Sequence, residues 1–466
     1  MDHSRCKPAA AYHPVNHVMD QRTFLELASA QGQVIHIDRP VDPYLELAAV
    51  SGALEDEAPG RIVRFSQVVG SEYEVVTGLC ADRRHFATSL GCAAPELILR
   101  LAAALANPQP PPVLPADQAP CQEVIELAPN LETIPFLTHW ASDAGPYATA
   151  AVLFTNDPET GANASFHRVL RLGPRQAALR LVERRGTDSA LRKTRGDLPV
   201  AICIGLPLHV LLAASMAPPA GVDELTLAQA LAPTPLVRCR TNPLLAPAAA
   251  EVVIEGRLTH RLTAEGPFVD LTQTLDFVRQ QPLLEVDCIT HRRRPLYHAL
   301  LPGRLEHKLL MGMPREPTIF HEVNQVCRCL NVHITPGGAS WLHAVVQIAK
   351  QTPDDGRRAI EAAFRGHTSL KHVVVVDSDI DPFNPADVEW AIATRFQAGQ
   401  GLHVFQNQPS SSLDPSALHV PGQKSRSDKA GVDATICWDT PTGPREPAAY
   451  RKVVFPTVDL NRYRST

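Results

Sequence analysis

Apolar residues near the start of the chain recur with helical spacing, and the short runs between them alternate as in strands. This pattern predicts helices over residues 23–30, 44–54 and 96–105, and strands over 33–37 and 61–65. Six prolines then fall within residues 107–120. Proline cannot continue a helix or the interior of a sheet, so this stretch is either a linker or a crossover along a sheet edge. We place the end of an N-terminal α/β domain, residues 1–115, at this stretch.

Strand patterns dominate the middle of the chain, residues 116–315. Residues 156–161, Asn-Asp-Pro-Glu-Thr-Gly, are dense in turn formers and predict a hairpin between strands over 148–155 and 165–172. A region rich in strands with few helices indicates a barrel or a sandwich. Further strands are expected over 200–205, 236–240 and 251–258, and short helices over 208–216 and 224–231.

The last part of the chain, residues 316–466, returns to an α/β pattern. The run from His372 to Asp377 is continuously apolar up to its acid, as in a strand covered on both faces. Asn384 and Pro385 then open a helix over 386–396, because asparagine caps helix N-termini and proline suits the first turn.

Composition narrows the class of protein. The chain has 466 residues with 44 Lys and Arg against 49 Asp and Glu, a net charge of −5, which argues against a nucleic-acid-binding protein. No apolar run approaches the roughly 20 residues of a membrane helix, and the first 20 residues lack the apolar core of a signal peptide. Ten cysteines without a CxxC pair read as reduced thiols. We therefore expect a cytoplasmic protein that binds neither nucleic acid nor membrane.

Several catalytic motifs are missing from the sequence. It has no GxGxxG after a strand, no GxxxxGK[ST], no HExxH and no GxSxG. Dehydrogenase, P-loop, zinc-protease and α/β-hydrolase chemistry therefore lack support.

Arg168 is the first candidate for a catalytic group. On a strand over 165–172 it shares one face with Phe166 and Leu170, and a guanidinium group among apolar neighbours is costly unless it is paired. Arginine also suits the binding of a carboxylate through two parallel hydrogen bonds. The alternative is an arginine that reaches water at the sheet edge.

Three acidic residues offer further chemistry. Glu265 and Asp270 flank a Gly-Pro turn, and two carboxylates near one arginine have their pKa values pushed apart, so that one can remain a proton donor. The alternative is a solvated turn. Glu224 either compensates a helix dipole or offers oxygen to a hard cation.

These segments, in this order, resemble the UbiD family of reversible decarboxylases, which use prenylated FMN. The resemblance spans roughly residues 23–460. It is carried by residues 163–168, 215–224, 251–256, 265–268, 375–381 and 413–416. It implies an N-terminal α/β part, a central split β-barrel of the flavin-reductase type and a C-terminal α/β domain that carries oligomer contacts.

The resemblance also implies roles for individual residues. Arg168 would orient the substrate carboxylate and help the cofactor mature, Glu265 would hold Arg168, and Asp270, shorter than the usual Glu, would give the proton to the product carbon. Losing CO2 from an sp² carbon leaves a carbanion that needs a cofactor as electron sink and one well-placed acid. The residues expected at the cofactor are Asn163, Ser165, Phe166, His167, Arg168, Arg184, Met216, Ala217, Glu224 and Lys429.

In this family a divalent cation, Mn²⁺ or Mg²⁺, with K⁺ nearby, joins the cofactor phosphate to Asn, His and Glu ligands. Asn163 and Glu224 match, but no His occurs between His167 and His209. Either Glu183 replaces it, or Arg184 or Arg185 contacts the phosphate directly. The missing histidine brings the metal site into question, and leaves the expectation of a flavin unchanged.

We therefore expect a non-oxidative decarboxylase of an aromatic, heteroaromatic or α,β-unsaturated carboxylic acid. Its partners would be that acid, CO2, a flavin prenyltransferase as the source of cofactor, and at least one further copy of the chain in a homodimer or larger homo-oligomer. The alternative is a flavin-binding carrier without turnover.

Overall fold

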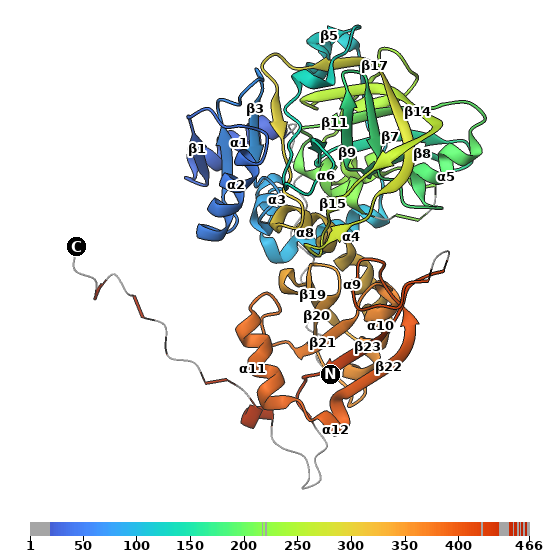
Figure 1. The fold of residues 1–466 in the computed structure, drawn as a ribbon. Helices are drawn as coiled ribbons and strands as arrows, with labels where there is room; N and C mark the ends of the chain where they lie inside the picture. Colours follow the sequence, from blue (N-terminus) through green and yellow to red (C-terminus); the bar gives the residue numbers. More distant parts are fainter. Residues whose placement is uncertain are drawn as a thin grey trace. The chain divides into compact units, whose positions relative to one another are not determined.

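The structure is a computed structural model. It describes residues 19–216, 218–219, 221–420, 423–437, 447–450, 452–453, 456, 458–459 and 462–463. The chain divides into two compact units (Figure 1). The larger is Met1–Pro317 with Pro336–Trp341, and the smaller is Thr318–Thr335 with Leu342–Thr466.

The first elements of the larger unit confirm the helices and strands predicted before residue 107. Asp20 caps α1 by accepting a hydrogen bond from the backbone N–H of Thr23. Strands β1, β2, β3 and β18 form a four-stranded sheet in that order. The bounds are α1 (Gln21–Ala30), β1 (Val34–Ile37), α2 (Glu46–Glu57), β2 (Ile62–Phe65), β3 (Glu74–Thr77), α3 (Arg83–Ser89), α4 (Leu97–Ala106) and β18 (Leu296–His298).

The proline-rich stretch runs along a sheet edge, which is the second of the two alternatives left open by the sequence. Within it, β4 (Val113–Leu114) pairs in parallel with β12 (Leu236–Arg238). Strand β12 pairs in turn with β13 (Leu245–Pro247).

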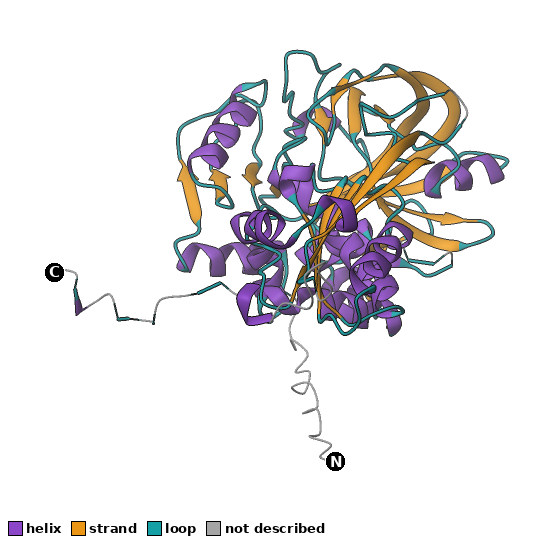
Figure 2. Ribbon diagram, turned by 90° about the horizontal axis from the view of Figure 1, so that it is seen from below, coloured by secondary structure: helices purple, strands orange, loops and turns teal. Residues whose placement is uncertain are grey.

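A nine-stranded sheet forms the centre of the larger unit. Its order is β6-β9-β10-β17-β14-β11-β7-β8, and β5 also pairs with β17. Figure 2 colours these strands orange and the helices beside them purple. The bounds are β5 (Val124–Glu126), β6 (Tyr147–Ala148), β7 (Val152–Asp157), β8 (Gly161–Phe166), β9 (Val169–Gly173), β10 (Gln176–Leu179), β11 (Leu198–Ile204), β14 (Val252–Glu265) and β17 (Arg279–His291).

The single strand predicted over 165–172 is wrong, although the predicted hairpin of β7 and β8 is confirmed. The strand is interrupted at His167 and Arg168, because β8 pairs with β7 whereas β9 pairs with β10 and β6. Phe166, Arg168 and Leu170 therefore do not lie along one strand.

This interruption bends the sheet. Strands β8 and β9 lie six places apart in the order, about 29 Å in a flat sheet at roughly 4.8 Å per strand. The three peptide links from Phe166 to Val169 span at most about 11 Å. The sheet must therefore curl until its two ends approach, and Arg168 sits where they meet.

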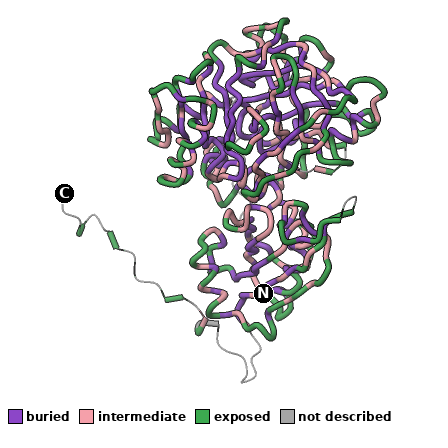
Figure 3. Tube along the Cα trace, in the orientation of Figure 1, coloured by how far each residue is buried: buried purple, intermediate pink, exposed green. Residues whose placement is uncertain are grey.

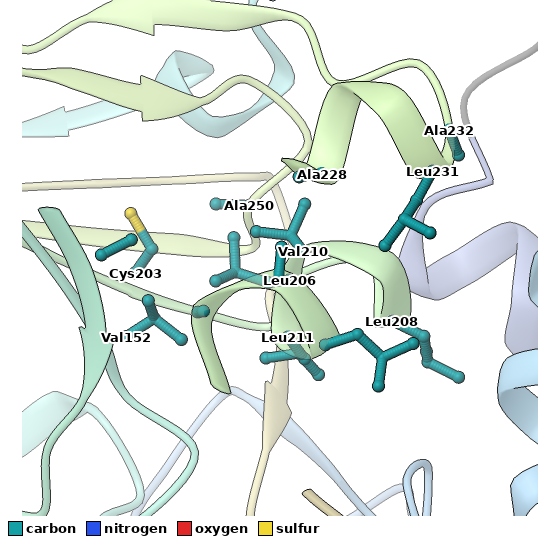
Figure 4. Close-up of a cluster of buried hydrophobic side chains, with 14 of the residues drawn as sticks. Val152, Cys203, Leu206, Leu208, Val210, Leu211, Ala228, Leu231, Ala232 and Ala250 are labelled. Carbon is teal, nitrogen blue, oxygen red and sulfur yellow. The ribbon is translucent and has the colours of Figure 1, made fainter. Parts of the chain in front are cut away.

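Two apolar helices pack beside the end strand β8. They are α6 (Leu208–Ser215) and α7 (Glu224–Leu231), and both confirm the sequence prediction. Figure 4 shows their side chains meeting residues of β7 and β11, such as Val152 and Cys203. The larger unit is completed by α5 (Gly186–Lys193), β15 (Phe268–Val269), β16 (Leu275–Asp276) and α8 (Leu305–Gly312).

The smaller unit is a five-stranded sheet in the order β19-β20-β21-β23-β22. Val374 and Val376 pack with Val388 and Ala391 of α11, so alternation turns Val373 and Val375 of β21 to the opposite face, where α10 packs. The apolar run of β21 is thus buried on both faces, as predicted (Figure 3). The bounds are α9 (Glu316–Asn324), β19 (Cys329–Ile334), β20 (His343–Ile348), α10 (Asp355–Gly366), β21 (His372–Asp377), α11 (Pro385–Arg395), α12 (Ala398–Gly401), β22 (Leu402–Pro409) and β23 (Arg426–Asp433).

Among the described residues, no single helix has both the length and the hydropathy to cross a membrane. In the part of the chain that the structure describes, one sharply bent pair, Arg83–Ser89 and Ala94–Ala106, passes such a test on length and composition together.

Candidate functional site

Arg168 is held by three carboxylates at the seam of the curled sheet. Its Nε donates to Glu265 Oε1 at 2.8 Å, and its Nη2 donates to Glu265 Oε2 at 2.9 Å. Nη1 lies 3.3 Å from Asp270 Oδ2, and Nη2 also donates to Asp276 Oδ2 at 2.9 Å. The guanidinium and both predicted acids therefore converge, together with a third acid that we did not predict.

The turn after β14 brings the acids to the arginine. Glu265 is the last residue of β14, and the peptide bond between Gly266 and Pro267 is cis. Gly266 has φ of 91°, and a Cβ there would lie 2.7 Å from the carbonyl oxygen of Phe277, so only glycine fits. The chain then forms the β15–β16 hairpin, in which Phe268 pairs with Asp276. Glu265, Asp270 and Asp276 thus come from one short stretch.

Aromatic rings enclose the ion pairs. The Arg168 guanidinium lies 4.6 Å from the centroid of the Phe268 ring, a cation–π contact. Tyr147 packs against the same ring, donates its hydroxyl proton to Glu265 Oε1 at 3.1 Å, and accepts the Gly266 N–H at 3.2 Å. Glu265 is fully buried, so its charge depends on these partners.

The charges shift one another's protonation. Burial alone would lower the pKa of Arg168, but the hydrogen bonds and charge of Glu265, followed by Asp270 and Asp276, raise it above its usual value. Burial likewise would raise the pKa of Asp276, yet hydrogen bonds and charges of Arg279 and Arg168 lower it. Arg168 and Asp276 are therefore both ionised at neutral pH.

His307 also faces this group, and no pattern in the sequence singled it out. Burial lowers the pKa of the imidazole, while the nearby charge of Asp270 opposes that change. Its Nδ1 accepts the backbone N–H of Gly303 at 3.1 Å, so in the neutral ring the proton is on Nε2. Glu306, which precedes His307 in α8, accepts hydrogen bonds from the backbone N–H groups of Gly78 and Cys80. These bonds fix the position of the helix.

A second group of predicted residues lies along β8. The Asn163 amide donates to Ser165 Oγ at 3.2 Å, and His167 Nε2 lies 3.0 Å from the same oxygen. Helices α6 and α7 pack against this strand, and Glu224 at the start of α7 accepts the Ala164 N–H at 2.8 Å. Asn163, Ser165, His167 and Glu224 are thus brought together.

The other predicted cofactor and metal residues are placed differently. Glu183 and Arg184 are exposed, and Glu183 lies 3.4 Å from Arg180 rather than beside Glu224. Phe166 packs against the core of α6 and α7, and Met216 is buried at the end of α6. Ala217 lies outside the described residues.

Lys429 belongs to the smaller unit. Its Nζ donates to the carbonyl oxygen of Thr368 at 2.7 Å and lies 5.0 Å from the ring of Phe364. Burial, and then the charge of Lys424, lower its pKa to about 8. The residue lines a cavity of about 300 Å³ together with Phe405.

The donors along β8 suit a flavin phosphate and a hard cation. Strand β8 ends the sheet, so backbone groups on its outer edge are not used by a neighbouring strand. Burial raises the pKa of Glu224 to about 7, and no cationic side chain bonds it within the described part of the chain. A buried carboxylate without a counter-charge, bonded to the backbone of the residue next to Asn163, offers the oxygen ligands that Mg²⁺ and Mn²⁺ prefer. Two of the three expected ligands therefore fit, and the histidine has no equivalent.

Comparison with known families covers nearly all of this architecture. Residues 25–105, 113–305 and 308–434 match the models for the N-terminal, Rift-related and C-terminal domains of UbiD, 3-octaprenyl-4-hydroxybenzoate carboxy-lyase. The chain belongs to the UbiD family. Membership makes it a decarboxylase of the carboxy-lyase class.

Two similar UbiD-family relatives are anhydromevalonate phosphate decarboxylases. The protein from Methanothermobacter thermautotrophicus is 40% identical over 81% of this chain and 89% of its own length. The one from Methanosarcina mazei is 38% identical over 90% of this chain and 96% of its own length.

Solved UbiD-class structures share the fold. HmfF from Pelotomaculum thermopropionicum, in complex with FMN, has a TM-score of 0.88 and 37% identity, covering 96% of this chain and 100% of its own. The 3,4-dihydroxybenzoic acid decarboxylase AroY from Klebsiella pneumoniae has a TM-score of 0.86 and 27% identity, covering 96% and 99%. An evolved dimeric form of HmfF was solved with prenylated FMN.

Proposed function

We propose that this UbiD-family enzyme decarboxylates an α,β-unsaturated carboxylic acid, or an aromatic or heteroaromatic one, with prenylated FMN as electron sink. The observation that carries the proposal is the Arg168 side chain, which is 9% exposed, pairs with Glu265 and also contacts Asp270. An arginine in this state can hold a substrate carboxylate beside a proton donor.

Glu265 and Asp270 would have different roles in the reaction. Prenylated FMN, when bound, accepts the electron pair that the departing CO2 leaves behind. Glu265 is fully buried and holds Arg168 through two hydrogen bonds, so its role is to fix the guanidinium. The Asp270 side chain is 27% exposed and bonds Arg168 at 3.3 Å, the longest of these contacts. It is therefore the acid best placed to give a proton to the product carbon.

The cofactor would lie along the outer edge of β8. Asn163, Ser165, Phe166 and His167 would line it with Met216 and Ala217. Lys429, which belongs to the smaller unit, stays a sequence-based prediction for the cofactor phosphate. Asn163 and Glu224 would hold a Mg²⁺ or Mn²⁺ ion that neutralises that phosphate, with K⁺ nearby. Glu183 and Arg184 are exposed, which makes them weaker candidates for this cradle.

The named relatives narrow the substrate class. Dehydration of a 3-hydroxy acid such as mevalonate gives an α,β-unsaturated acid, so anhydromevalonate phosphate falls within the chemistry proposed here. Relatives that act on it share 38–40% identity over most of this chain. We therefore place a phosphorylated α,β-unsaturated acid first among candidate substrates.

Two arginines of the larger unit support a phosphate-bearing ligand. Burial, and then the charge of Arg185, lower the pKa of Arg315, so the two guanidinium groups lie near enough to repel. A phosphate bound between them would accept hydrogen bonds from both and would offset the repulsion. If the substrate supplies that phosphate, Arg315→Met raises KM while flavin is retained. Loss of flavin would assign the phosphate to the cofactor instead.

Three finer features follow from family membership. The curled nine-stranded sheet would be the split β-barrel of the flavin-reductase type, within domains at 1–115, 116–315 and 316–466. A flavin prenyltransferase would supply the cofactor. The enzyme would form a homodimer or a larger homo-oligomer, which light scattering on the purified protein would measure.

The decisive experiment uses the full chain co-expressed with a flavin prenyltransferase. Absorbance and mass of the released small molecule should show a flavin with an added five-carbon ring. CO2 release should then be measured with anhydromevalonate phosphate, an aryl acrylic acid and a dihydroxybenzoic acid. In ²H₂O the product should carry deuterium at the carbon that lost CO2.

The Asp270→Asn variant tests the proposed proton donor. It should keep the flavin and lose at least about 100-fold in turnover, the usual worth of a general acid. Asp197→Asn is the matched control, because Asp197 is an exposed acid on Arg257 and should leave turnover unchanged. Bound flavin without CO2 release from any acid would contradict the proposal and support a carrier.

A further inference from the structure

The Glu265–Arg168–Asp270 network contains a third carboxylate, Asp276, which belongs to no part of the proposed chemistry so far. Asp276 Oδ2 accepts a hydrogen bond from Arg168 Nη2 at 2.9 Å. The hydrogen bond that Nη2 donates to Glu265 Oε2 has the same length. Its other oxygen, Oδ1, pairs with Arg279 of β17. Asp276 therefore links the arginine of the site to a second arginine.

The hydrogen-bond donors of Arg168 can be counted one by one. A guanidinium group has five N–H donors, one on Nε and two on each Nη. Nε and one Nη2 hydrogen go to Glu265, and one Nη1 hydrogen goes to Asp270. Asp276 takes the second Nη2 hydrogen. The one donor left over is on Nη1, the nitrogen beside Asp270.

We infer that Asp276 is a positioning residue, which occupies Nη2 of Arg168 so that a substrate carboxylate can bind only at Nη1, next to Asp270. This inference rests on the proposed function for the identity of the substrate. Without Asp276 the guanidinium would have two nitrogens with a spare donor. A carboxylate bound at Nη2 would be held away from the proton donor.

The backbone and Arg279 fix Asp276 in this role. Asp276 is paired with Phe268 across the β15–β16 hairpin, and Phe268 lies against the Arg168 guanidinium. The Asp276 side chain is 16% exposed, so it is largely but not completely excluded from solvent. Arg279 neutralises part of its charge, which allows three acids to surround Arg168.

Two substitutions of Asp276 separate the loss of the hydrogen-bond acceptor from the loss of the negative charge. Asp276→Ala removes the acceptor and frees Nη2 of Arg168. We expect kcat to fall about tenfold, which corresponds to the free energy of one charge-assisted hydrogen bond. KM should fall with kcat, because substrate then also binds in the unproductive pose. Asp276→Asn keeps an acceptor and removes the charge. Its kcat and KM should both stay near wild type, because Nη2 of Arg168 remains occupied.

The control is a second arginine with three acids. Arg257 bonds Asp197, Glu285 and Asp287, and Asp197→Ala removes one of them in the same way. This variant should leave kcat and KM unchanged. A merely structural role of Asp276 predicts the same result for Asp276→Ala, and that outcome would overturn the inference.

A measurement without substrate keeps the test independent of the proposed function. Phenylglyoxal labels accessible arginines, and mass spectrometry of peptides reports the rate at Arg168. Asp276→Ala should raise that rate several-fold, while Asp197→Ala raises it at Arg257 alone. If wild type releases no CO2 from any acid, the proposed function fails, and the labelling rate still decides the position of Arg168. If Asp276→Ala does not fold, Asp276→Ser, with its shorter side chain, replaces it in both assays. Unchanged kinetics together with an unchanged labelling rate would then overturn the inference.

Discussion

Tyr147 offers a direct test of how the buried acid of the site is held. Its hydroxyl donates to Glu265 Oε1 at 3.1 Å and accepts the Gly266 N–H at 3.2 Å. Burial, and then the charge of Glu265, raise the pKa of Tyr147, so the hydroxyl stays protonated and able to donate. Tyr147→Phe removes this one oxygen and leaves the ring packed on Phe268.

The expected loss of stability follows from these two bonds. A hydrogen bond to a charged group contributes about 1.5–3 kcal/mol, and a buried N–H left without a partner costs about 1–3 kcal/mol. Glu265 keeps both bonds from Arg168, so part of the loss is recovered. We expect a net cost of about 3 kcal/mol. For a unit of this size that corresponds to a fall of about 4 °C in the unfolding temperature.

The assay is differential scanning calorimetry of the full chain, with Tyr73→Phe as the matched control. The Tyr73 hydroxyl is also buried, but it has no hydrogen-bond partner among the described residues. Its removal relieves an unsatisfied group and should leave the unfolding temperature unchanged or slightly higher. Equal losses in the two variants would refute the reasoning, because the ring cavity rather than the hydrogen bonds would then set the cost.

Three further predictions concern the smaller unit. The pKa of Lys429 is lowered to about 8 in the folded state, against 10.5 ordinarily, so between these pH values the unfolded chain binds one more proton than the folded chain. The free energy of unfolding should therefore rise with pH from about 8 to 10.5 in wild type. Urea unfolding should show this rise in wild type and not in Lys429→Met. A Cβ on Gly431 would lie 2.2 Å from Ile360 Cγ2, so Gly431→Ala should cost about 1–3 kcal/mol by urea unfolding, whereas Gly399→Ala, with open space around it, should not. Asn384 caps α11 through the Ala386 N–H, and Asn384→Ala should cost about 1 kcal/mol in the same assay, with Asn384→Asp close to wild type.

Elements with a strong local signal could be predicted from the sequence. Helix α7 and strand β21 begin and end where the apolar pattern places them, and α11 begins at its asparagine cap. The predicted strand over 165–172 failed because local pattern does not record partners. No glycine or proline marks a break at His167 and Arg168, yet the pairing changes there from β7 to β10.

The candidate site divides in the same way. Arg168, Glu265 and Asp270 were selected because their residue types and spacing fit carboxylate chemistry, and the structure places them together, although their roles remain predictions. Asp276 carried no such signal. It lies among Leu275, Phe277 and Val278, and only the pairing of β15 with β16 turns it to Arg168.

The seam of the curled sheet explains why the site could be recognised without being derived. Two residues join strands from the two ends of the sheet, and such a short link has no room for a flexible loop. A side chain on that link is fixed by strands on both sides, which suits a group that must hold a carboxylate in one orientation. The acids reach it from β14 and the following hairpin, about 100 residues later in the chain. Position along the sequence therefore identifies the participants, and their convergence depends on closing the ends of a sheet that no local pattern describes.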